Sequence, residues 1–311
     1  MINQDFFRKK FSVGLCLNES LSDIIVFLEN NKEWLNSVYF SLPLGMRFYS
    51  RESLADEYEG AEEKLFYILS ILSDLEIRRE MAVNTWNLTR EELKRAIAYC
   101  REHQFCPEEI VCLKEYGELF SQKFPKSEIK YSVNNPESDG SGITNSFHTL
   151  VAGKGFLRNQ NARHTFLDKG YHMTLLLNNG CLPTCNTVCD AIKCHHYFDH
   201  AINVYGLDYI FAKCSFFPSE LRMLILSDKY AERYKFKISN RPLGLDYTQQ
   251  VLDAYLSLTD DYDAMNVDPK KLTLFCTAHP LAKNIQKVNL QNVKKLKSRW
   301  IMEMEYDNNR K

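Results

Sequence analysis

The stretch EIVCLKEYGELFSQKFPKSEIKYSV, residues 109–133, sets out the repeating unit of this chain. Glu109 to Leu113 is a short apolar run typical of a buried strand, and Glu128 to Val133 is a second one. Between them, Lys114 to Phe124 has the pattern of a helix. A strand, a helix and a second strand in this order predict a β-α-β unit and a parallel sheet.

The same alternation extends in both directions from this unit. Further strands are expected at residues 11–17, 38–42, 79–85, 149–152, 173–177 and 235–238. Helices are expected at residues 21–30, 61–75 and 247–258, and another should begin at Thr89, because Glu92 three positions later completes a capping box. The apolar run Tyr209 to Cys214 is expected to be an inserted strand, followed by a helix that opens at Pro218.

About eight strand-helix alternations in 311 residues predict a (β/α)8 barrel of the TIM type. We expect one domain over residues 1–311, with about 260–311 as a carboxyl-terminal extension packed on the outside. A doubly wound open sheet would give the same local pattern, but the chain has no Gly-x-Gly-x-x-Gly or phosphate loop to favour it. In a barrel, the loops after the strands form the site. Asn84, Asn134, Asn240, Arg241 and the loop after residue 177 should therefore share one rim.

Composition limits the class of protein and its partners. Apolar residues make up 45% and charged residues 25% of the chain, as in ordinary globular proteins. The net charge of −1 gives no overall attraction to nucleic acid, so composition alone does not support a nucleic-acid partner. The basic run at residues 294–299 is interpreted as a helix face. No stretch approaches the roughly 18 apolar residues that cross a bilayer, and the apolar run at 11–17 is too short for a signal peptide, so we expect a cytoplasmic protein without membrane contact.

Four of the ten cysteines crowd into the stretch Tyr171 to His200, directly after an expected strand. An iron-sulfur cluster needs about four thiolates at one point, and the candidate ligands of a 4Fe-4S cluster are Cys181, Cys185, Cys194 and Cys214. Zinc is the alternative ion, and its candidate ligands are Cys181, Cys185, Cys189, Cys194 and His195, with His200 as the alternative to His195. The other interpretation is that these thiols bind nothing and pack, as expected for the single cysteines Cys16, Cys100, Cys106, Cys112 and Cys276.

Three segments resemble the peptidase U32 family. They are LLLNNGCLPTC at residues 175–185, GFLRN at 155–159, and FKISNRPLGLDYTQQVLDAYLS at 236–257. In the last segment, Asn240 stands where the family has glycine. The resemblance implies a barrel and substrate contacts from Arg158, Asn159, Asn178 and Arg241. It also implies chemistry of one of two kinds, either that of collagenase-like peptidases or that of iron-sulfur proteins that support hydroxylation of RNA bases or quinone precursors.

These observations lead to one functional hypothesis and two alternatives. The hypothesis is a U32-like barrel with an iron-sulfur or metal centre on the loop after the seventh strand, supporting modification of a small molecule or nucleic acid. One alternative is a barrel without chemistry that binds a peptide or protein partner. The other is a U32-type peptidase, although the chain has neither a Gly-x-Ser-x-Gly elbow nor a His-Glu-x-x-His helix.

Overall fold

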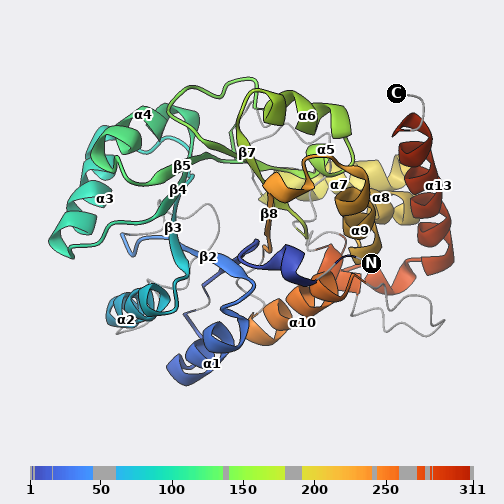
Figure 1. Cartoon of the computed structure of the whole chain (residues 1–311). Coiled ribbons are helices and arrows are strands. Elements are labelled where there is room, and N and C mark those ends of the chain that lie inside the picture. The colour runs from blue at the N-terminus through green and yellow to red at the C-terminus, as the bar shows by residue number, and fades with distance from the viewer. Residues whose placement is uncertain are drawn as a thin grey trace.

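The chain forms a closed barrel of eight parallel strands, in the order of the sequence (Figure 1). The computed structural model describes residues 2, 4–15, 17–44, 61–135, 140–178, 191–239, 244–258, 272–276, 281 and 283–308. The strands are β1 Phe11–Gly14, β2 Leu35–Phe40, β3 Arg78–Val83, β4 Glu109–Cys112, β5 Glu128–Tyr131, β6 Thr149–Ala152, β7 His172–Leu176 and β8 Tyr234–Lys237. β8 pairs with β1 and closes the sheet. The predicted TIM-type barrel and its eight strand positions are confirmed.

Helices lie outside the barrel and cover it. They are η1 Gln4–Phe7, α1 Leu21–Asn31, α2 Ala61–Asp74, α3 Arg90–Glu102, α4 Lys114–Lys123, α5 Lys154–Leu157, α6 Gln160–Asp168, α7 Ala191–Tyr205, α8 Leu207–Cys214, α9 Pro218–Ser227, η4 Ala231–Arg233, α10 Gly244–Ser257, η7 Thr273–Phe275, η8 Ile285–Lys287 and α13 Leu290–Asn308. The predicted capping box of α3 is present, with Thr89 and Glu92 bonded in both directions. The main apolar core lies between these helices and the outward-facing residues of the strands.

The run Tyr209 to Cys214 is helical, so the predicted inserted strand is wrong. Gly206, with φ at +85°, ends the preceding helix and starts α8 in a backbone conformation that glycine adopts readily. Six apolar-rich residues fit a buried helix as well as a strand, and only the surrounding chain decides between them.

The connection from β5 to β6 has turns in its described residues where the other units have a helix. Phe147 covers the barrel there, and its ring meets the ring of Tyr131 at 5.1 Å between centroids. The close approach depends on Gly117 of α4, because a Cβ atom at that position would lie 2.3 Å from Cζ of Phe147. Gly117 therefore leaves room for the ring of Phe147 in a connection that has no helix in its described residues.

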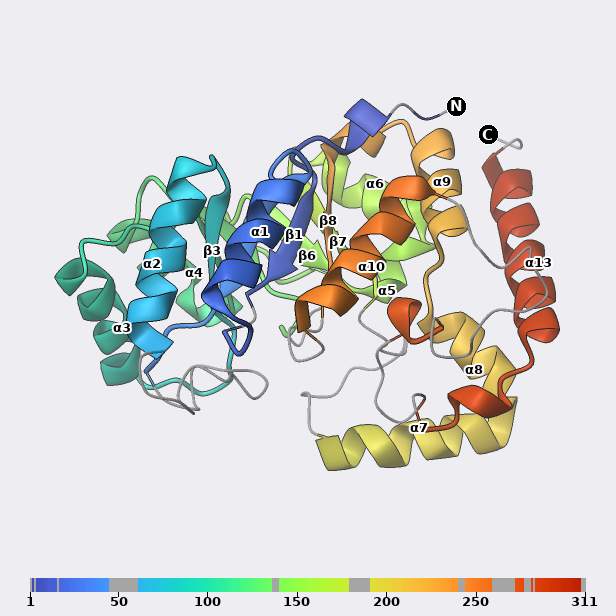
Figure 2. The same cartoon turned by 90° about the horizontal axis from the view of Figure 1, so that it is seen from below.

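Three helices, α7, α8 and α9, are inserted between β7 and β8. Figure 2 shows α7 at the edge of the molecule, away from the strands, and α13 beside α8 and α9. The last helix of the chain thus packs on this insertion, outside the barrel. None of the helices in the described ranges has the length and apolar composition needed to cross a membrane.

Candidate functional site

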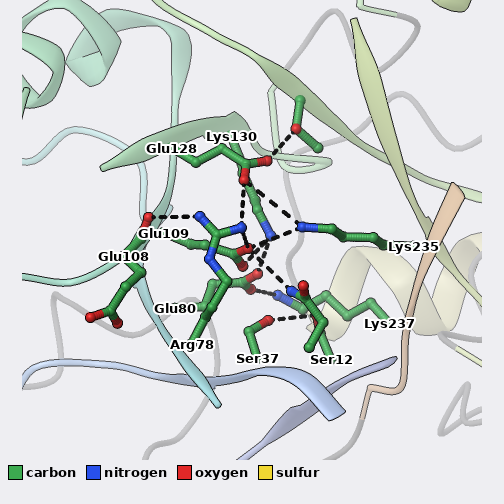
Figure 3. A network of polar contacts seen from close by, with 12 residues as sticks. Ser12, Ser37, Arg78, Glu80, Glu108, Glu109, Glu128, Lys130, Lys235 and Lys237 are labelled. Atoms are coloured by element: carbon green, nitrogen blue, oxygen red, sulfur yellow. Dashed lines mark hydrogen bonds and ion pairs between the residues drawn. The ribbon is translucent and has the colours of Figure 1, made fainter. Parts of the chain in front are cut away.

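Charged side chains fill the interior of the barrel, because residues of β3, β4, β5 and β8 point inward. The residues are Arg78, Glu80, Glu109, Glu128, Lys130, Lys235 and Lys237, drawn in Figure 3. Four cations and three carboxylates form one connected set of ion pairs.

Lys130 lies at the centre of this network and is fully buried. Its ammonium group contacts Glu80 at 2.8 Å and also pairs with Glu109, and both carboxylates have no exposed side-chain surface. Burial alone would lower the pKa of Lys130, but the charges of Glu109 and Glu80 outweigh burial and raise it. Burial likewise opposes ionisation of Glu109, and the charges of Lys130, Lys235 and Arg78 hold the pKa of Glu109 well below its usual value. The central lysine is therefore a charged structural group, unsuited to act as a nucleophile.

The network opens to solvent at the amino-terminal mouth of the barrel. Arg78 contacts Glu109 at 2.7 Å and Glu128 at 2.9 Å, and Lys235 contacts Glu109 at 3.3 Å. The side chains of Arg78, Lys235 and Glu128 are 35%, 26% and 19% exposed. The four more deeply buried members, two lysines and two glutamates, balance in charge. The excess positive charge therefore lies at the amino-terminal mouth, where water reaches it.

At the other end, Lys237 lies beneath the carboxyl-terminal rim, which we define as the residues directly after the strand ends. Its ammonium group pairs with Glu80 and lies 3.8 Å from the centre of the Tyr39 ring. The hydroxyl of Tyr39 donates to the carbonyl of Ile238 at 2.9 Å. A small apolar cluster, formed by Val111, Val151 and Leu176, completes this layer.

The loop after β3 and the loop after β5 meet at the carboxyl-terminal rim through Ser132. Its hydroxyl accepts from Nδ2 of Asn84 at 3.3 Å and from the backbone N–H of Asn134 at 3.1 Å. Nδ2 of Asn134 also donates to the carbonyl of Asn84 at 3.3 Å. The structure therefore confirms that Asn84 and Asn134 share the rim.

Asn178 joins the ends of β7 and β8. Its Oδ1 accepts from the backbone N–H of Ser239 at 2.8 Å and from its hydroxyl at 3.1 Å. Its Nδ2 lies within 3.2 to 3.4 Å of the Tyr247 hydroxyl and the carbonyls of Leu274 and Ser239. The cysteine loop follows Asn178 directly, and the segment with Arg241 follows Ser239 directly. The residues that directly precede the two segments are thus hydrogen-bonded to each other on the rim.

Arg158 binds the protein itself. Its guanidinium contacts Glu220 at 2.7 Å and donates to the carbonyls of Lys213 at 2.9 Å and Ser215 at 2.5 Å, on either side of Cys214. Lys297 of α13 reaches the same carbonyl of Ser215 at 3.1 Å and the other oxygen of Glu220 at 2.5 Å. The structure therefore brings together Arg158 and the backbone around Cys214, two of the positions singled out in the sequence.

Glu220 carries the negative charge of this cluster. Burial opposes its ionisation, but the adjacent charges of Arg158 and Lys297 lower the pKa of Glu220 to about 2. Two cations and one buried carboxylate therefore close the carboxyl-terminal end of α8, where free carbonyl groups favour positive charge.

Asn159 is held in place by a helix-capping hydrogen bond. Its Oδ1 accepts from the backbone N–H of Ala162 at 3.0 Å, so it is the amino-terminal cap of α6. An Asn at this position stabilises the start of a helix by filling one of its free donors.

The cysteine positions differ in how much the structure says of them. Cys181, Cys185 and Cys189, like Arg241 and Cys16, lie outside the described residues, and for Cys194 and His195 only the helical backbone of α7 is described. Cys214 is fully buried, and the packing expected for Cys100, Cys112 and Cys276 is confirmed. Cys106 is exposed, so the packing predicted for it is wrong. Among the described side chains, no three of His, Cys, Asp or Glu are arranged to hold a metal ion.

The interior charge network was missed at the level of sequence, although a signal was present. Charged residues recur at every second position in three of the expected strands: Arg78 and Glu80, Glu128 and Lys130, Lys235 and Lys237. Strands of a barrel are buried on both faces, so charge with a period of two places the charged side chains in the barrel interior.

Comparisons with known proteins leave the family open. No family model matches the chain, and no curated protein does. Among solved structures, the chain is similar to RipC from Yersinia pestis at 11% identity and a TM-score of 0.35, over 84% of this chain and 100% of that one. The assignment of the barrel rests on the strand order of this chain alone.

Proposed function

We propose that this chain is a peptidase U32-like barrel protein whose loop after β7 carries an iron-sulfur or metal centre, and that the centre supports modification of a small molecule or nucleic acid. The hydrogen bond from Ser239 to Asn178, 2.8 Å long, carries the proposal. Asn178, which directly precedes the cysteine loop, is thereby held on the carboxyl-terminal rim beside Ser239, which directly precedes the segment with Arg241. TIM-type barrels hold their active sites on this rim.

Cys214, one of the proposed cluster ligands, is fully buried in the apolar core. Arg158 and Lys297 donate to the carbonyl groups of the neighbouring residues Lys213 and Ser215, so positive charge lies near the backbone of this cysteine. A centre ligated by thiolates is negatively charged, and positive charge nearby favours its binding. Cys181, Cys185, Cys194 and Cys214 would hold an iron-sulfur cluster. Cys181, Cys185, Cys189, Cys194 and His195 are the donors for zinc.

The proposed substrate contacts are Arg158, Asn159, Asn178 and Arg241. The first three also bind protein groups, as described above. The cation of Arg241 suits an anionic group of the substrate.

The test is metal and acid-labile sulfide analysis of the full chain purified without oxygen, together with its visible absorbance. We expect bound iron or zinc that is lost in Cys181→Ala and in Cys185→Ala. The matched control is Cys106→Ala, which removes an exposed thiol from the connection before β4 and should leave the metal content unchanged. Colourless, metal-free protein, or equal metal in all four proteins, would overturn the proposal in favour of a barrel that binds a partner without chemistry.

A further inference from the structure

Helix α7 presents two exposed histidines that lie one turn apart. His196 and His200 are both on the solvent side of the helix, which runs from Ala191 to Tyr205. Residues four positions apart share one face of an α-helix, with Cβ atoms about 5–6 Å from each other. The two imidazole rings can therefore approach the same point above the helix surface.

The fold does not explain these two side chains. In the described part of the chain, neither His196 nor His200 makes a hydrogen bond, an ion pair or a ring contact. Other histidines of the protein are held by carboxylates: His164 lies 2.8 Å from Asp228, and His103 lies 3.2 Å from Glu62. Both side chains are exposed, so solvent reaches their rings.

We propose that His196 and His200 form a chelating site for a divalent transition-metal ion. Imidazole nitrogen suits Zn²⁺, Ni²⁺ and Cu²⁺, and two histidines at positions i and i+4 of a helix are a recurrent ligand pair for such ions. The site uses only nitrogen ligands of α7, and none of the cysteines is needed for it.

Asp199, three positions after His196, is also exposed. Among the described side chains it does not form a group of three ligands with the two histidines, so water completes the coordination. With two protein nitrogens as its ligands, the ion exchanges with solvent and binds more weakly than in a closed structural site.

The probe is Ni²⁺ alone, titrated by calorimetry into full-length protein whose accessible thiols are blocked with N-ethylmaleimide under native conditions. The blocking step removes the cysteines from the measurement, so this result and the metal analysis of the proposed function can fail independently. Circular dichroism before and after blocking checks that the fold is kept.

We expect His196→Ala and His200→Ala each to weaken Ni²⁺ binding by at least about tenfold, because loss of either ring removes the chelate. The double variant should lose little more than either single one. His103→Ala is the control, since it removes an exposed histidine that is paired with Glu62 and not with another histidine. Two small additive losses, unchanged binding in both single variants, or an equal loss in the control would overturn the proposal.

Discussion

Lys130 on β5 donates to Glu80 on β3 at 2.8 Å, across the interior of the barrel, and neither side chain has any exposed surface. Removing the lysine would leave two buried carboxylates without their shared cation. We expect Lys130→Met to reduce the free energy of unfolding by about 3–5 kcal/mol, the usual cost of breaking a buried ion pair from one side.

Urea denaturation of the purified variant measures this loss. Lys126→Met serves as the control, because Lys126 is exposed in the turn before β5 and its replacement should change stability by less than about 0.5 kcal/mol. Equal stabilities for the two variants would show that the interior network contributes nothing to the fold.

The carboxylate of Glu220 should make stability depend on pH. Its pKa falls from 4.5 to about 2 on folding, so the ionised group contributes about 3 kcal/mol that is present above its unfolded pKa and lost as the pH falls through the folded one. We expect Glu220→Gln to be less stable than the natural protein by about this amount at neutral pH. The difference should shrink as the pH drops from 4.5 towards 2.

Denaturant titrations at neutral pH and at about pH 3 test this expectation. Glu102→Gln, at the exposed end of α3, provides the comparison and should follow the natural protein at both values. A difference between Glu220→Gln and the natural protein that does not change with pH would rule out the electrostatic account.

Asn159 caps α6, and its replacement should affect stability alone. We expect Asn159→Ala to cost about 1 kcal/mol, as other cap deletions do. Asn203→Ala, in the exposed interior of α7, removes the same side chain without removing a cap and should not destabilise. Thermal unfolding compares the two. A fully stable Asn159→Ala protein that fails to bind substrate would contradict the cap role and favour a substrate contact for Asn159.

Asn178 should hold the rim ends of β7 and β8 together. We expect Asn178→Ala to cost about 1–3 kcal/mol, because partner groups in the interior lose their hydrogen bonds. Hydrogen exchange should accelerate at residues 234–239 and 272–276 and stay unchanged at β4. Asn178→Asp keeps the acceptor for Ser239 and should recover part of the protection. Unchanged exchange in the alanine variant would contradict this role.

Much of the fold could be predicted from the sequence because the strands are short segments rich in apolar residues that alternate with helical patterns, and several of them end at a polar or turn residue. Thr149 to Ala152 is strand β6 with the predicted bounds. The prediction of a strand at Tyr209 to Cys214 was wrong, because a short apolar stretch carries no period that distinguishes strand from helix.

The candidate site was less accessible from sequence. Asn178 was recognised as a rim residue, but its partners Ser239 and Leu274 lie 61 and 96 residues away and no local pattern links them. Arg158 and Asn159 were expected to contact substrate because of the family resemblance. The partners Lys213 and Glu220 of Arg158 lie 55 and 62 residues away in the insertion, so no local pattern reveals them, whereas Asn159 caps a helix that begins at the next residue.

The lysines that neutralise Glu80 are synthesised long after it: Lys130 lies 50 residues later in the chain and Lys237 lies 157 residues later. When only β1 to β4 have been synthesised, the carboxylate of Glu80 is present but neither lysine is. Burying it at that stage would leave a charge uncompensated. The charge balance of the native interior is therefore complete only when both β5 and β8 are present.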